Sequence, residues 1–389
     1  MKKVISILTA TRAEYGLLKP IITKLNIVDE FDVKIVATGT HLSPEFGLTY
    51  REIEKDGFVI DEKIEILLSS DTPSSISKSM GLAMISFADY FEKLNPDLLI
   101  VLGDRYETLA VATTAMNQRI PIAHLYGGET TEGAIDESIR HAITKLSYLH
   151  FTSTDEYRNR VVQLGENPER VYNVGAIGIE NILSEKLLQK EELENELKIS
   201  LSKPYAMVTF HPVTLENKSS ERQIESLLEV CKEYRSLDFI FTKANADAEG
   251  RIINQLIDSY AKENDNILAF TSLGMRRYLS ALKYCCMVIG NSSSGLLEAP
   301  SFGIPTVNIG DRQKGRLQAS GVINCEPTEG NIRQALDLAL SEELLQKAKR
   351  ADNPYGDGDT SNKIVTVIKE FVINNKIDLK KKFYDFEAN

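Results

Sequence analysis

The sequence lacks the patterns that identify a metal centre, a disulfide scaffold or a membrane anchor. Its four cysteines show no C-x-x-C spacing, and its five histidines form no H-x-x-H or H-E-x-x-H motif. No apolar stretch approaches the roughly 18 residues needed to span a bilayer. Arg12 and Glu14 interrupt the apolar N-terminal run and no small-residue cleavage site follows, so we interpret this run as a first β-strand and not as a signal peptide. These absences predict a cytoplasmic protein with reduced thiols, no metal and no membrane partner.

Excess positive charge is also missing, since the formal net charge is −11. This balance argues against nucleic acid as a partner. A local arginine cluster can still bind an anionic nucleotide, because distant surface charge is screened beyond about 8–10 Å. The sequence contains no internal repeat, and 389 residues suggest about two domains.

Apolar runs of strand length alternate with amphipathic stretches of helical length in both halves of the chain, which predicts parallel sheets built from βαβ units. The fold class we expect is α/β, with two Rossmann-like, doubly wound domains. A Lys/Glu-rich helical segment at Ser184–Leu197 indicates the crossing between them. We expect one domain at residues 1–178 plus 355–389 and the other at 179–354. The tail from Lys380 to Asn389 is interpreted as a solvated arm.

The chain is organised around Ile289–Arg316, IGNSSSGLLEAPSFGIPTVNIGDRQKGR, in which a strand leads through a serine turn into a short helix. Exposed backbone N–H groups ahead of a helix attract phosphate. Ser292 and Ser293 can donate hydroxyl hydrogen bonds, Glu298 suits ribose hydroxyls, and Arg312 lies in a basic loop suited to phosphate oxygens. The same residues could instead form a serine-rich helix N-cap followed by a solvated basic loop. The spacing of the serine turn, Glu298 and the basic loop favours a nucleoside-diphosphate site.

Four loops that follow strands of the first half are unusually polar, and ligands of open parallel sheets sit at such loops. Arg12 could reach a phosphate or sugar, or pair with Glu14. Asp104 and Arg105 leave a buried strand together, although Asp104 could instead cap the next helix. The remaining candidates in this half are Glu129, exposed by glycines, and Asp136 on a helix.

Three carboxylates around one site raise one another's pKa values, so that one can act as an acid while another acts as a base. Asp104, Glu129 and Asp136 would suit proton transfer on a sugar. In the second half, Phe210-His211-Pro212 ends a strand. His211 there is either a phosphate ligand or a neutral core imidazole.

Together these motifs resemble the hydrolysing UDP-N-acetylglucosamine 2-epimerases, in the branch of bacterial sialic acid pathways. The resemblance rests on TRAEYG, GDRYE, GGE, DESIRHAITKLS, FHPVT, GNSSSGLLE and IGDRQKGR, in this order over nearly the whole chain. The non-hydrolysing relatives carry TRPE, E-x-G-L-R and HRREN instead. The resemblance implies a GT-B-like fold with a cleft between its two domains.

The resemblance also implies site roles. Arg12 and Arg105 would contact the nucleotide sugar from the first domain. The second domain would hold UDP through His211, Asn245, Ser292, Ser293, Glu298 and Arg312. Asp104, Glu129 and Asp136 would be the acid and base residues of an anti-elimination of UDP followed by water addition. No cofactor is implied, and relatives form dimers or dimers of dimers, so a homodimer or homotetramer is expected.

The resemblance favours UDP-N-acetylglucosamine as the substrate, which would give N-acetylmannosamine and UDP. A similar branch acts on UDP-N,N'-diacetylbacillosamine in the legionaminic acid pathway and shares these motifs. Two readings from other classes are a GT-B glycosyltransferase, which needs an acceptor, and a non-catalytic UDP-sugar sensor. Neither explains why three carboxylates cluster in the first half.

Overall fold

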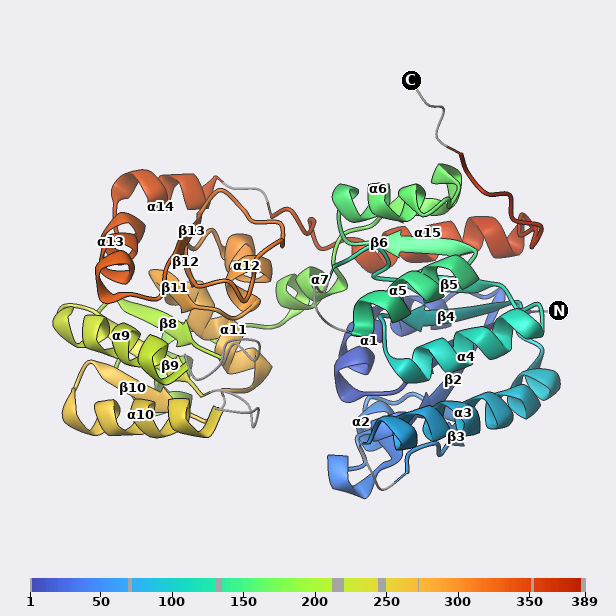
Figure 1. Cartoon of the computed structure of the whole chain (residues 1–389), viewed down its shortest axis with the longest axis horizontal. Helices are drawn as coiled ribbons and strands as arrows, with labels where there is room; N and C mark the ends of the chain where they lie inside the picture. Colours follow the sequence, from blue (N-terminus) through green and yellow to red (C-terminus); the bar gives the residue numbers. More distant parts are fainter. Residues whose placement is uncertain are drawn as a thin grey trace. The chain divides into compact units, whose positions relative to one another are not determined.

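The computed structural model describes residues 2–68, 72–130, 135–211, 220–243, 250–271, 273–350 and 353–385. The chain divides into two compact units, each with one parallel sheet and flanking helices (Figure 1). The first unit comprises Met1–Asn181 and Tyr355–Asn389, and the second comprises Ile182–Pro354. The predicted class, α/β with two doubly wound sheets, is confirmed.

The first sheet has the order β3-β2-β1-β4-β5-β6-β7, and every neighbouring pair is parallel. Its strands are β1 (Lys3–Thr9), β2 (Phe31–Thr38), β3 (Ile60–Ile64), β4 (Leu98–Leu102), β5 (Ile122–Leu125), β6 (Leu149–Thr152) and β7 (Val171–Asn173). The strand order reverses between β1 and β4, and such a switch point is where open α/β sheets bind ligands.

The second sheet has the order β10-β9-β8-β11-β12-β13 and is also wholly parallel. Its strands are β8 (Tyr205–Thr209), β9 (Asp238–Thr242), β10 (Ile267–Phe270), β11 (Met287–Gly290), β12 (Thr306–Ile309) and β13 (Val322–Cys325). Its switch point lies between β8 and β11.

Helices connect the strands in both units, and several begin at a Thr or Ser whose hydroxyl accepts a backbone N–H, as Thr11 does from Glu14. The first unit contains α1 (Arg12–Asn26), α2 (Tyr50–Lys55), α3 (Pro73–Leu94), α4 (Tyr106–Asn117), α5 (Ile135–Leu146), α6 (Asp155–Gln163) and α15 (Thr360–Ile373), and α7 (Ile177–Ser184) crosses from the first unit into the second. The second contains α8 (Lys190–Leu197), α9 (Ser220–Glu233), α10 (Gly250–Glu263), α11 (Gly274–Tyr284), α12 (Ser294–Leu297), α13 (Glu329–Ala339) and α14 (Glu342–Lys349). Short 3-10 turns are η1 (Gly39–Leu42), η2 (Pro44–Phe46), η3 (Pro168–Arg170) and η4 (Ala299–Phe302).

The first sheet is covered on both faces because alternate residues of a strand point to opposite sides. On β4, Leu98 and Ile100 belong to the core cluster that includes residues of α1 and α15. Leu99 and Val101 belong to the cluster that includes residues of α3, α4 and α5. In Figure 1 the red helix α15 accordingly lies with the blue-to-green part of the chain. Burial on both faces explains why β4 reads as the unbroken apolar run LLIVL.

The elements that the sequence pattern did not predict are mainly edge strands. The residues of β3 and β13 are largely exposed or half-buried, and β7 has only three residues. Strands with so little burial need no apolar run, so periodicity misses them. The predicted helical segment Ser184–Leu197 is two helices instead, since α7 ends at Ser184 and α8 begins at Lys190.

The described part of the C-terminal tail is largely exposed, as expected of a solvated arm, but it is not free of the first unit. Lys381 Nζ donates to the backbone oxygens of Lys145 and Ser147 at 3.0 and 2.6 Å, and Tyr384 N donates to Gly165 O at 2.9 Å. A Cβ on Gly165, whose φ is +87°, would lie 2.2 Å from the ring of Phe383. The tail is therefore bound along the first unit.

No helix in the described ranges combines the length and apolar character that a bilayer crossing requires.

Candidate functional site

In the first unit, the candidate residues follow three neighbouring strands. Arg12 follows β1, Asp104 and Arg105 follow β4, and Glu129 follows β5, while Asp136 lies in the first turn of α5. Because β1, β4 and β5 are adjacent in a parallel sheet, their carboxyl ends form one edge at the switch point. The fold therefore brings these predicted residues together on one edge.

Arg140 on α5 connects this set. Its side chain is 3% exposed, and its guanidinium forms an ion pair with the Asp104 carboxylate. It also donates to the backbone oxygen of Glu129 at 2.7 Å and to Glu137 Oε2 at 2.9 Å. Asp136 lies one helical turn before Arg140, so it occupies the same face of α5. Arg140 thus contacts the segments of Asp104 and Glu129, and the third predicted carboxylate, Asp136, lies on the same helix as Arg140.

The side chain of Asp104 does not cap a helix, so that alternative is wrong. The residue at the N-cap of α4 is Arg105, and no side chain caps this helix. The Glu129 carboxylate accepts a hydrogen bond from Ser153 Oγ at 2.8 Å. Both carboxylates therefore have defined partners and are half-buried.

Arg105 is held by a carboxylate that the sequence pattern did not identify. Its Nε and Nη2 donate to the two oxygens of Glu107 at 3.2 and 3.0 Å, and the Glu107 side chain is fully buried. These bonds use two of the five N–H groups of the guanidinium. The other three have no acceptor among the described residues, so they are available to an oxyanion.

Arg12 forms an ion pair with Glu52, 3.0 Å from Nε to Oε2, and not with Glu14. The alternative pairing within α1 is therefore wrong. The Arg12 side chain is 72% exposed, and exposed pairs of this kind contribute little to stability. A substrate anion could displace Glu52 at low cost.

Glu14 is a buried carboxyl beside Arg105. Its Oε2 accepts from Ala10 N at 2.7 Å, and its Oε1 is buried without a hydrogen-bond partner in the described part of the chain, 3.9 Å from Arg105 Nε. Burial raises the pKa of Glu14 to about 7, against the opposing effects of the Ala10 N–H and Arg105. Glu107, which also faces it, adds to the rise.

We expect Glu14→Gln to change the pH dependence of stability. Between the unfolded pKa near 4.5 and the folded pKa near 7, the native state binds more protons, so wild-type stability falls as pH rises. The full loss, on the order of 3 kcal/mol, is reached above pH 7. The variant lacks this titration, so its stability relative to wild type should be greater at pH 8 than at pH 5.

Urea unfolding at both pH values measures this difference, with the exposed Glu45→Gln as the matched control. Parallel pH profiles for wild type and Glu14→Gln would show that Glu14 ionises normally.

In the second unit, the candidates again follow adjacent strands. His211 lies beyond β8, Ser292 and Ser293 follow β11, and Arg312 follows β12. Asn245 lies outside the described residues. The second sheet therefore also gathers its described candidates at the carboxyl edge next to its switch point.

Asn291 ties these loops together and was missed from the sequence. It is fully buried, and its side-chain amide accepts from His211 N at 2.7 Å and donates to His211 O at 2.8 Å. Its backbone oxygen accepts from Arg312 Nη1 at 3.0 Å and from Gln313 Nε2 at 2.8 Å. The serine turn, the end of β8 and the basic loop thus form one hydrogen-bonded unit.

The serine turn is organised by bonds within the protein. Ser294 Oγ donates to the carboxylate of Glu298 and lies 2.6 Å from the hydroxyl of Tyr278. Burial raises the pKa of Glu298. At Gly290, with φ of +128°, a Cβ would lie 2.0 Å from Thr209 O, so this glycine permits close approach of β11 to β8. Ser292 and Ser293 remain half-buried beside it.

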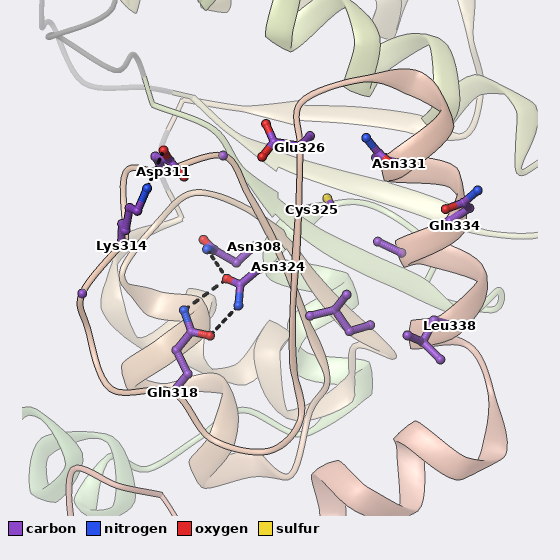
Figure 2. A pocket seen from close by; sticks show the side chains of 14 residues that line it. Asn308, Asp311, Lys314, Gln318, Asn324, Cys325, Glu326, Asn331, Gln334 and Leu338 are labelled. Carbon is purple, nitrogen blue, oxygen red and sulfur yellow. Dashed lines mark hydrogen bonds and ion pairs between the residues drawn. The ribbon is translucent and has the colours of Figure 1, made fainter.

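The basic loop also lines a cavity of about 660 Å³ at the edge of the sheet (Figure 2). Asn324 Oδ1 accepts from Asn308 Nδ2 at 2.8 Å and from Gln318 Nε2 at 3.1 Å, which joins the loop to β12 and β13. Asp311 and Lys314, which also line this cavity, pair at 3.3 Å. The side-chain amides of Asn308, Gln318 and Asn324 line this wall of the cavity. Arg312 does not belong to this wall and instead donates to Asn291 O.

The two edges differ in chemistry. The first presents carboxylates with an arginine that keeps three unused donors, which suits proton transfer beside a departing oxyanion. The second presents hydroxyls, backbone N–H groups and an arginine, which suits phosphate. Within the described ranges, no group of three or more His, Cys, Asp or Glu side chains is placed to hold a metal ion.

Comparison with known proteins agrees with this geometry. The family model described as UDP-N-acetylglucosamine 2-epimerase matches residues 23–369. Among solved structures, the UDP-GlcNAc 2-epimerase of Neisseria meningitidis bound to UDP-GlcNAc is similar with a TM-score of 0.79 and 21% identity, covering 95% of this chain and 100% of that one. That likeness establishes the GT-B-like fold.

Three curated relatives match over nearly their full lengths. The GDP/UDP-N,N'-diacetylbacillosamine 2-epimerase (hydrolyzing) of Campylobacter jejuni is 44% identical, covering 99% of both chains. The Polysialic acid biosynthesis protein P7 of Escherichia coli is 40% identical, covering 99% of this chain and 98% of that one. The UDP-N,N'-diacetylbacillosamine 2-epimerase (hydrolyzing) of Legionella pneumophila is 33% identical, covering 97% and 98%. The predicted resemblance is confirmed: this chain is an enzyme of the UDP-N-acetylglucosamine 2-epimerase family, among its hydrolysing members.

Proposed function

We propose that this enzyme acts on a nucleoside-diphosphate-linked N,N'-diacetylbacillosamine. It releases the free sugar inverted at C2, 2,4-diacetamido-2,4,6-trideoxymannose, together with the nucleoside diphosphate. The observation that carries the choice of sugar is the 44% identity, over 99% of both chains, to the Campylobacter jejuni enzyme named for this substrate. The Legionella pneumophila relative carries a similar name.

The proposed reaction begins with an anti-elimination. A carboxylate removes the C2 proton while the C1–O bond to the diphosphate breaks, giving a 2-acetamidoglycal. The C2 proton is not acidic, so departure of the leaving group runs ahead and positive charge builds at C1. Carboxylates stabilise that charge, and this supports roles for Asp104, Glu129 and Asp136.

Water then adds to the glycal. Its oxygen bonds to C1, and a proton is delivered to C2 on the face opposite the one from which the first proton left. Inversion therefore requires proton exchange on both faces of the ring, and a single carboxylate cannot serve both. The Asp104 and Glu129 segments joined by Arg140, with Asp136 one turn away on the same helix, provide the groups required.

The leaving diphosphate needs donors that the protein does not already use. Arg105 retains three N–H groups while Glu107 fixes its orientation. We propose that Arg105 and Arg12 contact the nucleotide sugar and that His211, Ser292, Ser293 and Arg312 bind the diphosphate. Glu298 is proposed to accept from the ribose hydroxyls. Its bond with Ser294 would then have to be shared or exchanged.

A second candidate substrate is UDP-N-acetylglucosamine, which would give N-acetylmannosamine and UDP. It is favoured by the 40% identity to the Escherichia coli protein named for polysialic acid biosynthesis. The two substrates differ at C4, where an acetamido group replaces a hydroxyl, and at C6, where a methyl group replaces a hydroxymethyl group. The elimination at C1 and C2 is the same for both.

Proton NMR in D2O tests the proposal with UDP- and GDP-linked diacetylbacillosamine and UDP-N-acetylglucosamine as parallel substrates. We expect free sugar deuterated at C2, and a kcat/KM at least about 10-fold higher for a diacetylbacillosamine nucleotide, the scale of a group contact in a specificity pocket. Activity should persist in EDTA.

Each other result has a defined meaning. Faster turnover of UDP-N-acetylglucosamine would replace the first substrate with the second. A nucleotide-linked epimer would contradict the hydrolytic step, and free sugar with unchanged configuration would contradict the elimination.

A further inference from the structure

A second cavity lies within the first unit. It is near the amino ends of strands β6 and β7, whereas the candidate site lies at the carboxyl ends of the strands. The cavity has a volume of about 540 Å³. Tyr148, which lines it, immediately precedes β6, and Arg170 immediately precedes β7. The carboxylates and arginines of the candidate site follow the carboxyl ends of β1, β4 and β5 instead. The cavity is therefore separate from the edge at which the reaction is proposed.

Arg170 is the unusual residue of this cavity. It is only 7% exposed, and its guanidinium lies over the ring of Tyr148 at 4.7 Å. Within the described residues its side chain has no hydrogen bond to the protein and no ion pair, although it lines the cavity. Arginine is almost never buried unless it is paired. Its five N–H donors must therefore be satisfied from the cavity, by solvent or by the acceptor atoms of a ligand.

Glu166, a buried carboxylate four residues before Arg170, is paired with other groups and not with Arg170 among the described residues. Glu166 accepts from Lys145 at 2.6 Å and from His150 at 3.1 Å, and it pairs with Lys381 at 2.8 Å. Burial opposes the ionisation of Glu166, but the bonds from His150 and the lysines outweigh it and lower its pKa to about 2. Lys145 and Lys381 thus share the single negative charge of Glu166.

The rim of the cavity adds further positive charge. Its lining includes five cationic side chains, Arg170, Lys376, Lys380, Lys381 and Lys382, and three acidic ones, Glu169, Glu370 and Asp378. Lys376 pairs with Glu370 at 2.6 Å, and Asp378 accepts from the backbone N of Lys380 at 3.0 Å. The side chains of Lys380 and Lys382 have no partner in the described structure. This positive concentration is local, since the chain carries a net charge of −11.

The walls of the cavity are aromatic. The rings of Tyr172 and Phe371 meet edge to face at 6.4 Å, and those of Tyr148 and Phe371 at 6.3 Å. All three residues line the cavity. An apolar wall with a fixed guanidinium in it suits a small ring that carries an oxyanion, because the ring packs on the aromatic surface while the anion bonds to the arginine.

We infer that this cavity is a binding site for a small molecule bearing a phosphate or carboxylate group. The Arg170 fork accepts the oxyanion, and Lys380 and Lys382 of the C-terminal tail attract it from the rim. Phosphate and carboxylate both match the planar fork of arginine. The site is assembled from the ends of β6 and β7, α15 and the tail, none of which is assigned a role in the proposed epimerisation.

The test is isothermal titration of the full-length protein with inorganic phosphate, and in a parallel arm with acetate. Besides any phosphate binding at the proposed diphosphate site of the second unit, we expect a saturable site that Arg170→Gln weakens at least about 10-fold, the loss of a bidentate charged contact. Arg170→Lys should weaken it less, because the charge remains but the fork is lost. Arg312→Gln, at the other proposed anion site, should leave this binding intact. Tighter binding of acetate than phosphate would identify the ligand class as a carboxylate.

A second variant tests the inference independently in case Arg170→Gln does not fold. Lys380 and Lys382 are exposed, so Lys380→Gln/Lys382→Gln should retain the wild-type melting temperature while weakening phosphate about 3-fold or more. The exposed Lys93→Gln is the matched control. Equal phosphate affinity in wild type and in a folded Arg170→Gln, or the absence of saturable binding, would overturn the inference. The readout is binding, so the result does not depend on the enzyme's substrate.

Discussion

Asp104→Asn should retain nucleotide binding and lose turnover by at least about 100-fold, the usual scale for an acid–base group. The substitution keeps the size of the side chain and removes the negative charge. Arg140 still has the Glu129 backbone oxygen and Glu137 as acceptors, so we expect the loop to remain in place. The groups proposed to bind diphosphate follow strands of the second sheet, so UDP affinity should change by less than about 3-fold, as for independent sites.

Two measurements separate these effects. Product formation in D2O gives turnover, and calorimetric titration with UDP gives affinity. Asp89→Asn, an exposed aspartate on α3, is the matched control and should behave as wild type. Normal turnover in Asp104→Asn would remove Asp104 from the proposed catalytic groups, whereas loss of UDP affinity would assign it to binding.

Arg140→Met should reduce both stability and activity. Removing the arginine of a buried ion pair takes away the partner of the Asp104 carboxylate and one of the partners of Glu137, which keeps its contact with His141, and costs about 3 kcal/mol or more. For a unit of this size that loss lowers the melting temperature by about 6–12 °C. Turnover should fall at least about 30-fold at a temperature where the variant is folded, because the Asp104 and Glu129 segments lose their common anchor.

Arg140→Lys refines the interpretation. A lysine keeps the charge but cannot bond Asp104, Glu137 and the Glu129 carbonyl with a rigid fork, so most of the stability should return and little of the activity. Arg333→Met, which breaks an exposed pair with Glu233, is the control and should leave melting and turnover nearly unchanged. Wild-type activity in a folded Arg140→Met would contradict the anchoring role.

The parts of the fold that the sequence predicts are those with the largest burial. Strands β4 (LLIVL) and β11 (MVIG) are fully buried apolar runs, the pattern from which parallel sheets are predicted. The edge strand β3 (IDEKI) has three charged residues in its middle, and β13 (VINC) has only four residues, so neither forms a long apolar run. Pairing with a neighbour forms them, and pairing depends on residues distant in sequence.

The same distinction holds for the candidate site. Placement after a strand identifies Asp104, Arg105 and Glu129, since strand ends are readable from apolar runs. Arg140 was named within its motif without a role, because its contacts depend on tertiary structure. One signal was present: Arg140 lies next to Ile139 and three residues before Ile143, on the apolar face of α5, where a charge requires a partner. Asn291 offered no comparable signal within the serine turn.

The first unit is built from both ends of the chain, and this affects its biosynthesis. Ile364, Ile368 and Phe371 of α15 share one core cluster with Ile5 and Leu18. Residues 182–354, the whole of the second unit, are translated before α15. On the ribosome, the N-terminal segment must therefore wait with part of its apolar sheet face uncovered while the inserted unit emerges, which makes that interval the time of greatest exposure to chaperones and to aggregation.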